Sequence, residues 1–571
     1  METVESTFDR NSFIETHNSR PVSSASAARL KRLAVPALFG LALCALAARA
    51  VQFSRGHPFP FYDEAGNLDQ ARGFAQEGGL GALVRDYATG RCLQDYRHPL
   101  YLTALTPLMR GEPADFARAK IAGLACALVL VVSIFLLCRR LWGQNVALAA
   151  AAAAALAPMT AGLSQNLTED VLFAALYGAA ILVLGGFGDE PAAWAAFGFL
   201  SGLAYLAKGD GHFLLLAALA VGLWRHGPRF LRGRSLLLAL GGFAAGGSFL
   251  LLRNVLVWGN PFHNANTQVF WLDDWTQVWR LSGSAEWSRV GASWYFRRHG
   301  AAQAVARVIN GIRPCVSDLL ACLAVGPRAT VAQAASSWSM AGLSALGLID
   351  SWRRGRREYV FAVLVPGAAL FCAFVWFAKV SANPRHLYPI AVSLYPAAAL
   401  GARALYRRWK SSLTSVPDVA RTALAVYCLA LVAGAARGPL DLRTLWSIPP
   451  GWGETSRWIA RHVDAHGYLI DDWSIYSNWD AGRYTARPFP MSASSAEVRA
   501  FVEREDISAA VVDMHLWKVR AHDDKYGPLD AHGPTSFLGW PRCGYAPERP
   551  SAFLTFAKDC SALVDDGAAR R

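Results

Sequence analysis

Charged residues are scarce in this sequence, which excludes a single soluble domain. Only 17% of its 571 residues are Asp, Glu, Lys or Arg, whereas 53% are apolar. Apolar runs close to twenty residues long recur through the first three quarters of the chain, and such runs can cross a bilayer as helices. They predict a polytopic all-α membrane protein with about eleven spans. These cover residues 33–53, 117–138, 144–162, 169–187, 192–208, 211–225, 235–258, 330–350, 358–378, 386–405 and 419–436.

Acidic residues are fewer than basic ones, 42 against 56, which gives a formal charge of +14. This excess does not indicate a nucleic-acid partner, because the Lys and Arg residues gather in the loops between alternate spans. Loops rich in Lys and Arg stay in the cytoplasm. They lie at residues 29–32, 139–140, 225–234, 353–357 and 407–410. We therefore expect a cytoplasmic N-terminus, and the Ala- and Arg-rich usage suggests a bacterial inner membrane.

Cysteines are few and scattered, and no spacing resembles a zinc site. Five of the ten fall in or beside predicted spans, where packing explains them. Among the others, Cys543 and Cys560 are a plausible disulfide outside the membrane, and Cys92 could pair with Cys315 or Cys322. The first span is followed by no small-residue cleavage motif, which predicts a retained signal-anchor.

The chain divides into three parts. Residues 1–32 form a predicted disordered cytoplasmic tail, residues 33–437 the transmembrane domain, and residues 438–571 a soluble periplasmic domain. Apolar stretches alternate with a predicted helix at residues 454–466 in the last part, which predicts a small α/β module. Residues 303–326 could be counted as a further span, but this would place the Arg cluster at 353–357 outside. They are therefore expected to be an amphipathic segment at the outer interface.

The first outer loop, residues 54–116, is far longer than an ordinary connection and so is expected to build something. Asp63 and Glu64 follow closely on the first span, where charge is costly unless it is solvated, paired or used. We predict that these carboxylates belong to the catalytic floor of an enzyme acting on a lipid-borne substrate. The alternative is that they only cap a helix that begins at residue 65, since acids suit helix N-termini.

The outer loops supply further ionisable side chains of both signs. Lys208, Arg253, Arg385 and His386 are candidates for binding a departing phosphate, although side chains at span ends can simply snorkel to the interface. A second group could position an acceptor, with interfacial packing or helix capping as the alternative. This group comprises Arg97, His98, Tyr101, Glu169 and Asp170. The two acids could also bind a divalent metal, but carboxylates alone do not indicate one, and no metal ligand is assigned.

Four motifs give the chain a resemblance to a known family over roughly residues 35–405. In chain order they are Asp63-Glu64-Ala65 with Arg97-His98-Pro99-Leu100-Tyr101, Leu203-Ala204-Tyr205-Leu206-Ala207-Lys208, Arg253-Asn254 with Gly259-Asn260-Pro261-Phe262, and Arg385-His386-Leu387-Tyr388-Pro389. Their order and sidedness resemble the GT-C superfamily of membrane glycosyltransferases, in its protein-mannosyltransferase-like and aminoarabinose-transferase-like branch (families 39 and 83). The chain departs from that branch at Arg97-His98-Pro99-Leu100, where many relatives have HPPL or KPPL, and at the Gly-Asp-Gly that follows Lys208.

The resemblance implies a GT-C fold and a glycosyltransferase that uses a polyprenyl-phosphate-linked sugar. The sugar would pass, with inversion and outside the membrane, to a lipid, glycan or protein acceptor, and Asp63 would be the catalytic carboxylate. The departures leave the sugar and the acceptor open. The alternatives are a polytopic lipid or solute transporter, whose alternating access the long outer loop does not suit, and a relative that binds such lipids without turning them over.

Overall fold

A computed structural model describes most of the first 412 residues and parts of the C-terminal region. The described residues are 24–56, 62–90, 97–112, 114–188, 190–274, 277–278, 281, 286–324, 331–412, 468–471, 486–488, 495–504, 509–513, 527–530, 533–546 and 553–560. Residues 1–23 of the predicted disordered tail lie outside these residues, whereas residues 24–32 are helical and begin the first helix, ahead of the predicted span at residues 33–53. The predicted span at 419–436, Cys92 and the predicted helix within 454–466 also lie outside the described residues.

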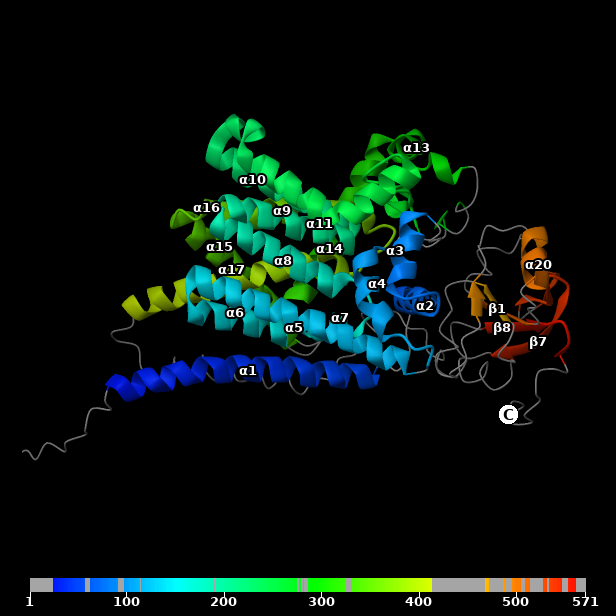
Figure 1. The fold of residues 1–571 in the computed structure, drawn as a ribbon, viewed down its shortest axis with the longest axis horizontal. Helices are drawn as coiled ribbons and strands as arrows, with labels where there is room; N and C mark the ends of the chain where they lie inside the picture. The colour runs from blue at the N-terminus through cyan, green and yellow to red at the C-terminus, as the bar shows by residue number, and fades with distance from the viewer. Residues whose placement is uncertain are drawn as a thin grey trace, which may run out of the picture.

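A bundle of long helices forms the body of the molecule (Figure 1). Its members are α1 (Ser24–Gly56), α5 (Asp115–Trp142), α6 (Gln144–Leu156), α7 (Pro158–Gln165), α8 (Asp170–Phe187), α9 (Pro191–Ala207), α10 (Leu214–His226), α11 (Arg234–Trp258), α14 (Ala301–Leu323), α15 (Val331–Arg353), α16 (Arg357–Phe377) and α17 (Tyr388–Ser412). Short 3₁₀ segments join several of them: η2 (Gly209–Phe213), η3 (Gly227–Arg232) and η7 (Pro384–Leu387).

The prediction of many spans is confirmed in its coarser form, a mostly helical multi-pass membrane protein. Among the described residues, five helices are long and apolar enough to cross a membrane, and six if the bent pair α6 and α7 counts as one span. That pair bends by 55° because Pro158 follows Ala157, whose backbone is extended as residues before proline usually are. The expected spans at α9 and α10 have only 17 and 13 residues, short for a bilayer crossing.

The bend between α6 and α7 exposes a backbone acceptor that α1 uses. The amide of Thr160 donates to Ala157 rather than to Leu156. The Nη1 of Arg49, a residue of α1 that is 5% exposed, donates to the carbonyl of Leu156 at 2.6 Å. A buried charged side chain on the first helix thereby fixes it to the break in its neighbours.

Glycines let two helix pairs approach closely. A Cβ at Gly198 of α9 would lie 2.0 Å from the carbonyl oxygen of Ala239 in α11. A Cβ at Gly347 of α15 would lie 1.8 Å from the carbonyl oxygen of Ala397 in α17. Small residues at such contacts are how membrane helices gain van der Waals packing.

Short helices of the first outer loop cover one end of the bundle: α2 (Tyr62–Gln76), α3 (Leu80–Ala88), α4 (Pro99–Leu105) and η1 (Thr106–Leu108) (Figure 1). Helix α2 begins three residues earlier than predicted, so Asp63 and Glu64 lie in its first turn. A cluster including Leu68, Tyr87 and Leu102 packs these helices together.

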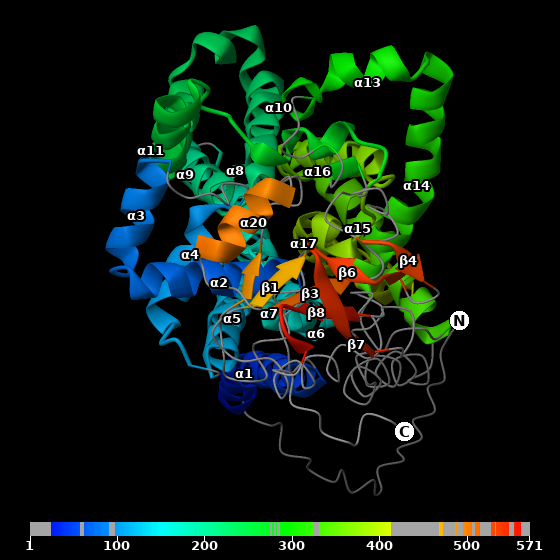
Figure 2. The ribbon, with the colours of Figure 1, turned by 90° about the vertical axis from the view of Figure 1, so that its right-hand side faces the viewer.

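At another edge of the same end lie η4 (Ala265–Thr267), η5 (Val269–Trp271), η6 (Trp287–Arg289), α13 (Ala292–Arg298) and the start of α14. Figure 2 shows α14 side-on at the edge opposite α3, while α1 is seen nearly end-on. Helix α14 exposes apolar side chains such as Val305 and Ile309 on one face, and Gln303 and Asn310 lie on another. This arrangement agrees with the prediction of an amphipathic segment at residues 303–326.

The C-terminal region contains a mixed sheet, which agrees with the predicted α/β module. Its strand order is β2 (Ala486–Pro488), β1 (Tyr468–Asp471), β3 (Ala509–Asp513), β8 (Phe553–Ala557), β7 (Trp540–Ala546) and β6 (Ser536–Phe537). Strand β1 runs parallel to β2 and β3, and β8 runs antiparallel to β3. Helix α20 (Ser495–Arg504) and a two-stranded sheet of β4 (Leu529–Asp530) and β5 (Gly533–Pro534) complete the described part.

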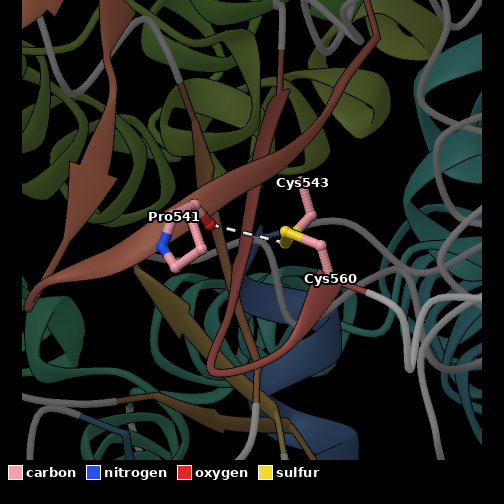
Figure 3. Close-up of a disulfide and its surroundings, with 3 residues drawn as sticks. All are labelled: Pro541, Cys543 and Cys560. Carbon is pink, nitrogen blue, oxygen red and sulfur yellow. Dashed lines mark hydrogen bonds between the residues drawn. A yellow bond between two sulfur atoms is a disulfide. The ribbon is translucent and has the colours of Figure 1, made fainter.

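A disulfide joins Cys543 of β7 to Cys560 beyond β8, as predicted (Figure 3). The carbonyl oxygen of Pro541 lies 3.4 Å from the Cys543 sulfur. This is a van der Waals contact, since a sulfur in a disulfide carries no proton to donate. Cys315 and Cys322, with either of which Cys92 could pair, are both buried, and the Cys322 sulfur lies 3.1 Å from the carbonyl oxygen of Pro384.

Candidate functional site

Side chains from four separate parts of the sequence meet at the end of the bundle that α2 to α4 cover. Asp63 comes from the first turn of α2, and Asp170 begins α8. Lys208 follows the last residue of α9, and Arg385 lies in η7, immediately before α17. Asp170, Lys208 and Arg385 lie at or next to the ends of the bundle helices α8, α9 and α17, so the bundle itself sets their positions.

These four residues form a ladder of alternating charge. Arg385 Nη2 lies 2.7 Å from Asp63 Oδ2, and its Nη1 lies 3.9 Å from Asp170 Oδ2. Lys208 Nζ donates to Asp170 Oδ1 at 2.7 Å. The Asp170 side chain is 2% exposed, whereas that of Asp63 is 27% exposed. The buried carboxylate of Asp170 therefore holds both Arg385 and Lys208, whereas the carboxylate of Asp63 stays accessible.

Electrostatics keep the ladder ionised. Burial raises the pKa of Asp63, but the positive charges of Arg385 and Arg97 outweigh burial, and the pKa is lowered overall. Burial lowers the pKa of Lys208, but Asp170 and its neighbouring carboxylates outweigh that effect and raise the pKa. Glu169 behaves differently, because burial and the charge of Asp170 both raise its pKa. Asp63 is thus the carboxylate that is both charged and reachable.

His386 and His98 lie beside these groups. The Nδ1 of His386 lies 3.5 Å from Lys208 Nζ, and burial lowers the pKa of His386 well below its ordinary value. Burial likewise lowers the pKa of His98 to about 4. Its Nε2 would lie 3.4 Å from a Cβ placed at Gly209. Both imidazoles are therefore neutral near pH 7 and can bind through hydrogen bonds but not through charge.

Arg97 holds the first turn of α2 in place. Its Nη1 donates to the backbone carbonyl of Asp63 and to Asn67 Oδ1, both at 2.9 Å. A Cβ at Gly66 would lie 2.1 Å from the guanidinium of Arg97, so a larger residue there would displace this side chain. Tyr87 donates its hydroxyl to the carbonyl of Arg97 at 2.7 Å. The motif that was predicted to position an acceptor thus fixes the backbone of Asp63.

Glu64 points into the protein. Its side chain is buried, with the residue 1% exposed, and Oε1 accepts the backbone N–H of Leu167 at 3.0 Å. Asn67 Nδ2 donates to the carbonyl of the same residue at 2.7 Å. Together they clamp the loop that leads into Glu169 and Asp170. Glu64 is therefore buried and holds a backbone N–H, unlike the accessible Asp63 beside it.

Arg253 and Tyr101 are buried in the surrounding structure. Arg253 is 3% exposed, and its Nη1 donates to Asn254 Oδ1 at 3.0 Å. The Nδ2 of Asn254 donates to the carbonyls of Pro261 and His263, so the Arg-Asn and Gly-Asn-Pro-Phe motifs form one folded unit. Tyr101 is 2% exposed, and its hydroxyl has no hydrogen-bond partner among the described residues.

A second buried ion pair was not predicted. Arg72 Nε lies 2.7 Å from Asp115 Oδ2, and Asp115 also accepts the backbone N–H groups of Arg110, Gly111 and Glu112. This pair joins α2 to the start of α5. The sequence showed Arg72 on the apolar stripe of a short helix, but it carried no sign of the partner.

No set of three or more His, Cys, Asp or Glu side chains within the described residues could hold a metal ion. The acids of the ladder face Arg385 and Lys208 instead. A divalent metal stays a prediction that nothing in the structure tests.

Comparisons with known proteins agree with this picture. Residues 99–258 match the model of the dolichyl-phosphate-mannose-protein mannosyltransferase family, a segment that includes Asp170, Lys208 and Arg253. The solved structure of ArnT from Cupriavidus metallidurans bound to undecaprenyl phosphate is similar, with a TM-score of 0.53 and 14% sequence identity over 92% of this chain and 99% of that one. The apo structure of the same protein gives a TM-score of 0.52 at 14% identity over 95% and 100% of the two chains. No curated protein matches the chain. The predicted resemblance to the GT-C superfamily is confirmed, and the chain shares the fold of ArnT.

Proposed function

We propose that this chain is a membrane glycosyltransferase that moves a sugar from a polyprenyl phosphate to an acceptor at the end of the bundle covered by α2 to α4. The observation that carries the proposal is the ladder of Asp63, Arg385, Asp170 and Lys208, which combines an accessible carboxylate with two fixed cations. The undecaprenyl phosphate in the similar ArnT structure supports a lipid phosphate as the donor's carrier. We infer that the acceptor is a lipid, glycan or protein outside the cytoplasm.

Asp63 is proposed to act as the general base. In an inverting transfer the acceptor oxygen attacks the anomeric carbon, the bond from that carbon to the phosphate oxygen breaks, and its electrons leave with the polyprenyl phosphate. The acceptor's proton must go to a base placed beside it. Asp63 is ionised, is 27% exposed and is held by Arg97 through its backbone, so it meets this need.

Arg385 and Lys208 are proposed to stabilise the leaving phosphate. A guanidinium can bind a phosphate through two parallel hydrogen bonds, and fixed cations favour the charge that develops on the leaving group. Arg385 is paired to Asp63 at 2.7 Å. A phosphate that draws Arg385 away would raise the basicity of Asp63. Donor binding would thereby strengthen the base that the reaction needs.

Glu64, Asn67 and Arg97 are proposed to be positioning residues. Glu64 and Asn67 bind the backbone of Leu167, and Arg97 binds that of Asp63. They fix the two loops that carry the carboxylates of the ladder. Arg253 stabilises the neighbouring Asn254 unit, and its use for the donor phosphate stays a proposal.

The test is an Asp63→Asn variant in cells that lack the gene. Mass spectrometry of envelope lipids, glycans and proteins should find a species that loses a sugar in the deletion, regains it with the unchanged chain and does not regain it with Asp63→Asn. Native mass spectrometry of the purified variant should still find bound polyprenyl phosphate, because the cations remain. Turnover should fall roughly 10²- to 10⁴-fold, the usual contribution of a general base.

Asp86→Asn is the matched control, since Asp86 is also paired to an arginine, at 2.8 Å, on the neighbouring helix α3. It should restore the sugar fully. If no molecule loses a sugar in the deletion strain, the proposed activity is wrong. If Asp63→Asn restores it as well as the unchanged chain does, a transporter is the better description.

A further inference from the structure

A second cluster of charge lies away from the ladder, between α13, α14 and the end of α16. Asp273 is its centre. Lys379 Nζ lies 2.6 Å from Asp273 Oδ1, His299 Nε2 lies 3.0 Å from Oδ2, and Arg307 Nη1 lies 3.9 Å from Oδ1. One carboxylate thus faces three basic side chains.

His299 has hydrogen-bond acceptors at both ring nitrogens. Its Nδ1 lies 3.2 Å from Gln303 Oε1, an atom that also accepts the backbone N–H of Gly300. Its Nε2 faces the carboxylate of Asp273. Lys379 and Arg307 alone place two positive charges against the one negative charge of Asp273.

Arg307 is fixed rigidly beneath the cluster. Its guanidinium lies 4.5 Å from the ring centroid of Trp376 and 5.0 Å from that of Tyr295. Nε donates to the carbonyl of Trp376 at 2.9 Å, and Nη2 donates to that of Phe270 at 3.3 Å. Nη1 is buried and has no hydrogen-bond partner among the described residues. A buried cation held in this way supplies a permanent positive potential.

The three basic partners of Asp273, which are His299, Arg307 and Lys379, line a cavity of about 350 Å³. Its polar lining consists of Tyr295, His299, Gln303, Arg307, Asn310 and Lys379. The cavity is large enough for a small anionic group, and Lys379, with 48% of its side chain exposed, stands at its surface. The uncompensated positive charge is what an anion would neutralise.

The setting of the cavity indicates a lipid headgroup. Helix α14 turns Gln303, Arg307 and Asn310 toward the cavity, at helical spacing, while an apolar strip on its other face is exposed. This strip consists of Val305, Val308, Ile309, Ile312 and Val316. A helix of this kind lies at the boundary of the hydrocarbon region, which places its polar face at headgroup depth. Trp271, Trp294 and Trp376 around the cluster are also typical of that depth.

The cavity is separate from the proposed donor site. His386, beside Lys208, stacks on Phe374 with ring centroids 4.7 Å apart, and Phe377 stacks on Phe270 at 6.4 Å. The carbonyl of Phe270 accepts from Arg307. Aromatic side chains therefore stand between the two sites, and one phosphate cannot occupy both.

We propose that the cavity around Asp273, His299, Arg307 and Lys379 binds the phosphate of a membrane-lipid headgroup. This lipid is distinct from the sugar donor. Lys379 and His299 contact the phosphate, Gln303 and Asn310 bind the remainder of the headgroup, and Arg307 provides the field beneath it. Asp273 orients the cations and also limits the affinity, because it competes with the phosphate for them.

The test measures lipid binding by native mass spectrometry of the full chain in detergent, titrated with phosphatidylglycerol and with zwitterionic phosphatidylethanolamine. Phosphatidylglycerol should bind more tightly. Lys379→Gln should weaken its binding roughly tenfold, the size of one charge-assisted hydrogen bond. Asp273→Asn should instead tighten it several-fold, because the competing carboxylate is gone. Opposite signs for two residues that contact each other are not expected from a general loss of structure.

Arg354→Gln is the matched control. Arg354 is paired to Asp350 at 2.7 Å with 47% of its side chain exposed, close to the values for Lys379, but it lies just beyond the last residue of α15 and outside the Asp273 cluster. Equal affinities for Lys379→Gln and this control would overturn the proposal, as would weaker binding in a folded Asp273→Asn. Soluble glycerol 3-phosphate should compete poorly, and a soluble phosphate that binds as tightly as the lipid would overturn the assignment to a headgroup. Turnover is not measured, so the result is independent of the proposed transferase activity.

Discussion

The molecule carries two clusters of charged side chains at one end of its bundle, and they differ in charge balance. The ladder of Asp63, Arg385, Asp170 and Lys208 has two acids and two bases. The cluster around Asp273 has one acid and three basic partners. In the first, every charge is compensated and the groups are poised to exchange partners during a reaction. In the second, a permanent excess of positive charge suits a bound anion that stays in place.

Breaking the ladder should have the largest effect. Arg385→Gln would leave the nearly buried Asp170 with less compensation and Asp63 without its partner, and removal of one member of a buried pair costs about 3–5 kcal/mol. Turnover should fall roughly 10²- to 10³-fold with the loss of a donor to the leaving phosphate. Thermal unfolding measures the expected loss of stability, and single-turnover assays measure the expected loss of turnover.

Lys379→Gln is the corresponding change in the other cluster, and it should leave turnover nearly unchanged. The Asp273 cluster keeps two basic partners, and Lys379 is half exposed. Surface pairs contribute at most about 1 kcal/mol. If Arg385→Gln and Lys379→Gln lose equal stability, the difference in charge balance between the two clusters does not affect the free energy of unfolding.

The role of Glu64 can be separated from that of Asp63 by two substitutions. Glu64→Gln keeps an oxygen for the N–H of Leu167 and should retain most activity, whereas Glu64→Ala should lose roughly tenfold to 100-fold through misplacement of the loop before Asp170. The readout is kcat/KM for each variant. If Glu64→Gln is as inactive as Asp63→Asn, then Glu64 takes part in proton transfer.

The pH dependence should follow the lowered pKa of Asp63. Because its pKa in the folded protein lies below the unfolded value of about 3.9, the stabilisation from its pairing is complete above that value and is lost as the pH falls through the folded pKa. The acidic limb of kcat/KM should therefore lie below about pH 4. In Arg385→Lys or Arg385→Gln variants with residual activity, weaker attraction leaves burial dominant, and the limb should move to higher pH. Glu169→Gln is the control. If the acidic limb of kcat/KM disappears in this variant, the limb reports Glu169 and not Asp63.

The smallest effect is expected from a chelator. Arg385 and Lys208 already compensate the carboxylates of the ladder, so EDTA should change turnover by less than the error of the assay. A loss of activity that Mg²⁺ or Mn²⁺ restores would show that a metal shares this site.

The sequence allowed the sidedness and the main charged residues of the ladder to be predicted, because hydropathy and Arg-rich loops limit which segments can meet. Asp63 and Arg385 are 322 residues apart, yet both were assigned to the same face. The clamp between Glu64 and Leu167 could not be predicted, since one partner is a backbone N–H that carries no sequence signal.

The Asp273 cluster was missed for a related reason. Its Trp-rich surroundings are typical of a membrane interface, where Trp side chains anchor a protein without forming a site. Lys379 and Asp273 are 106 residues apart, and neither lies in a motif. Helix α2 begins at Tyr62 rather than at residue 65 because its first turn is held by Arg97 through the carbonyl of Asp63, a contact that helical periodicity cannot reveal.

The hydrogen bond from Arg49 to the carbonyl of Leu156 has a consequence for catalysis. This hydrogen bond fixes the position of α1 along its own axis. If α1 slid by one helical turn, the residues that follow it would move by about 5.4 Å. Asp63 follows α1 by a few residues, so its height above the bundle depends on a side chain two turns below the end of the helix. Loss of the Arg49 side chain would let the first helix shift along its axis and would displace Asp63, although none of the four ladder residues is substituted.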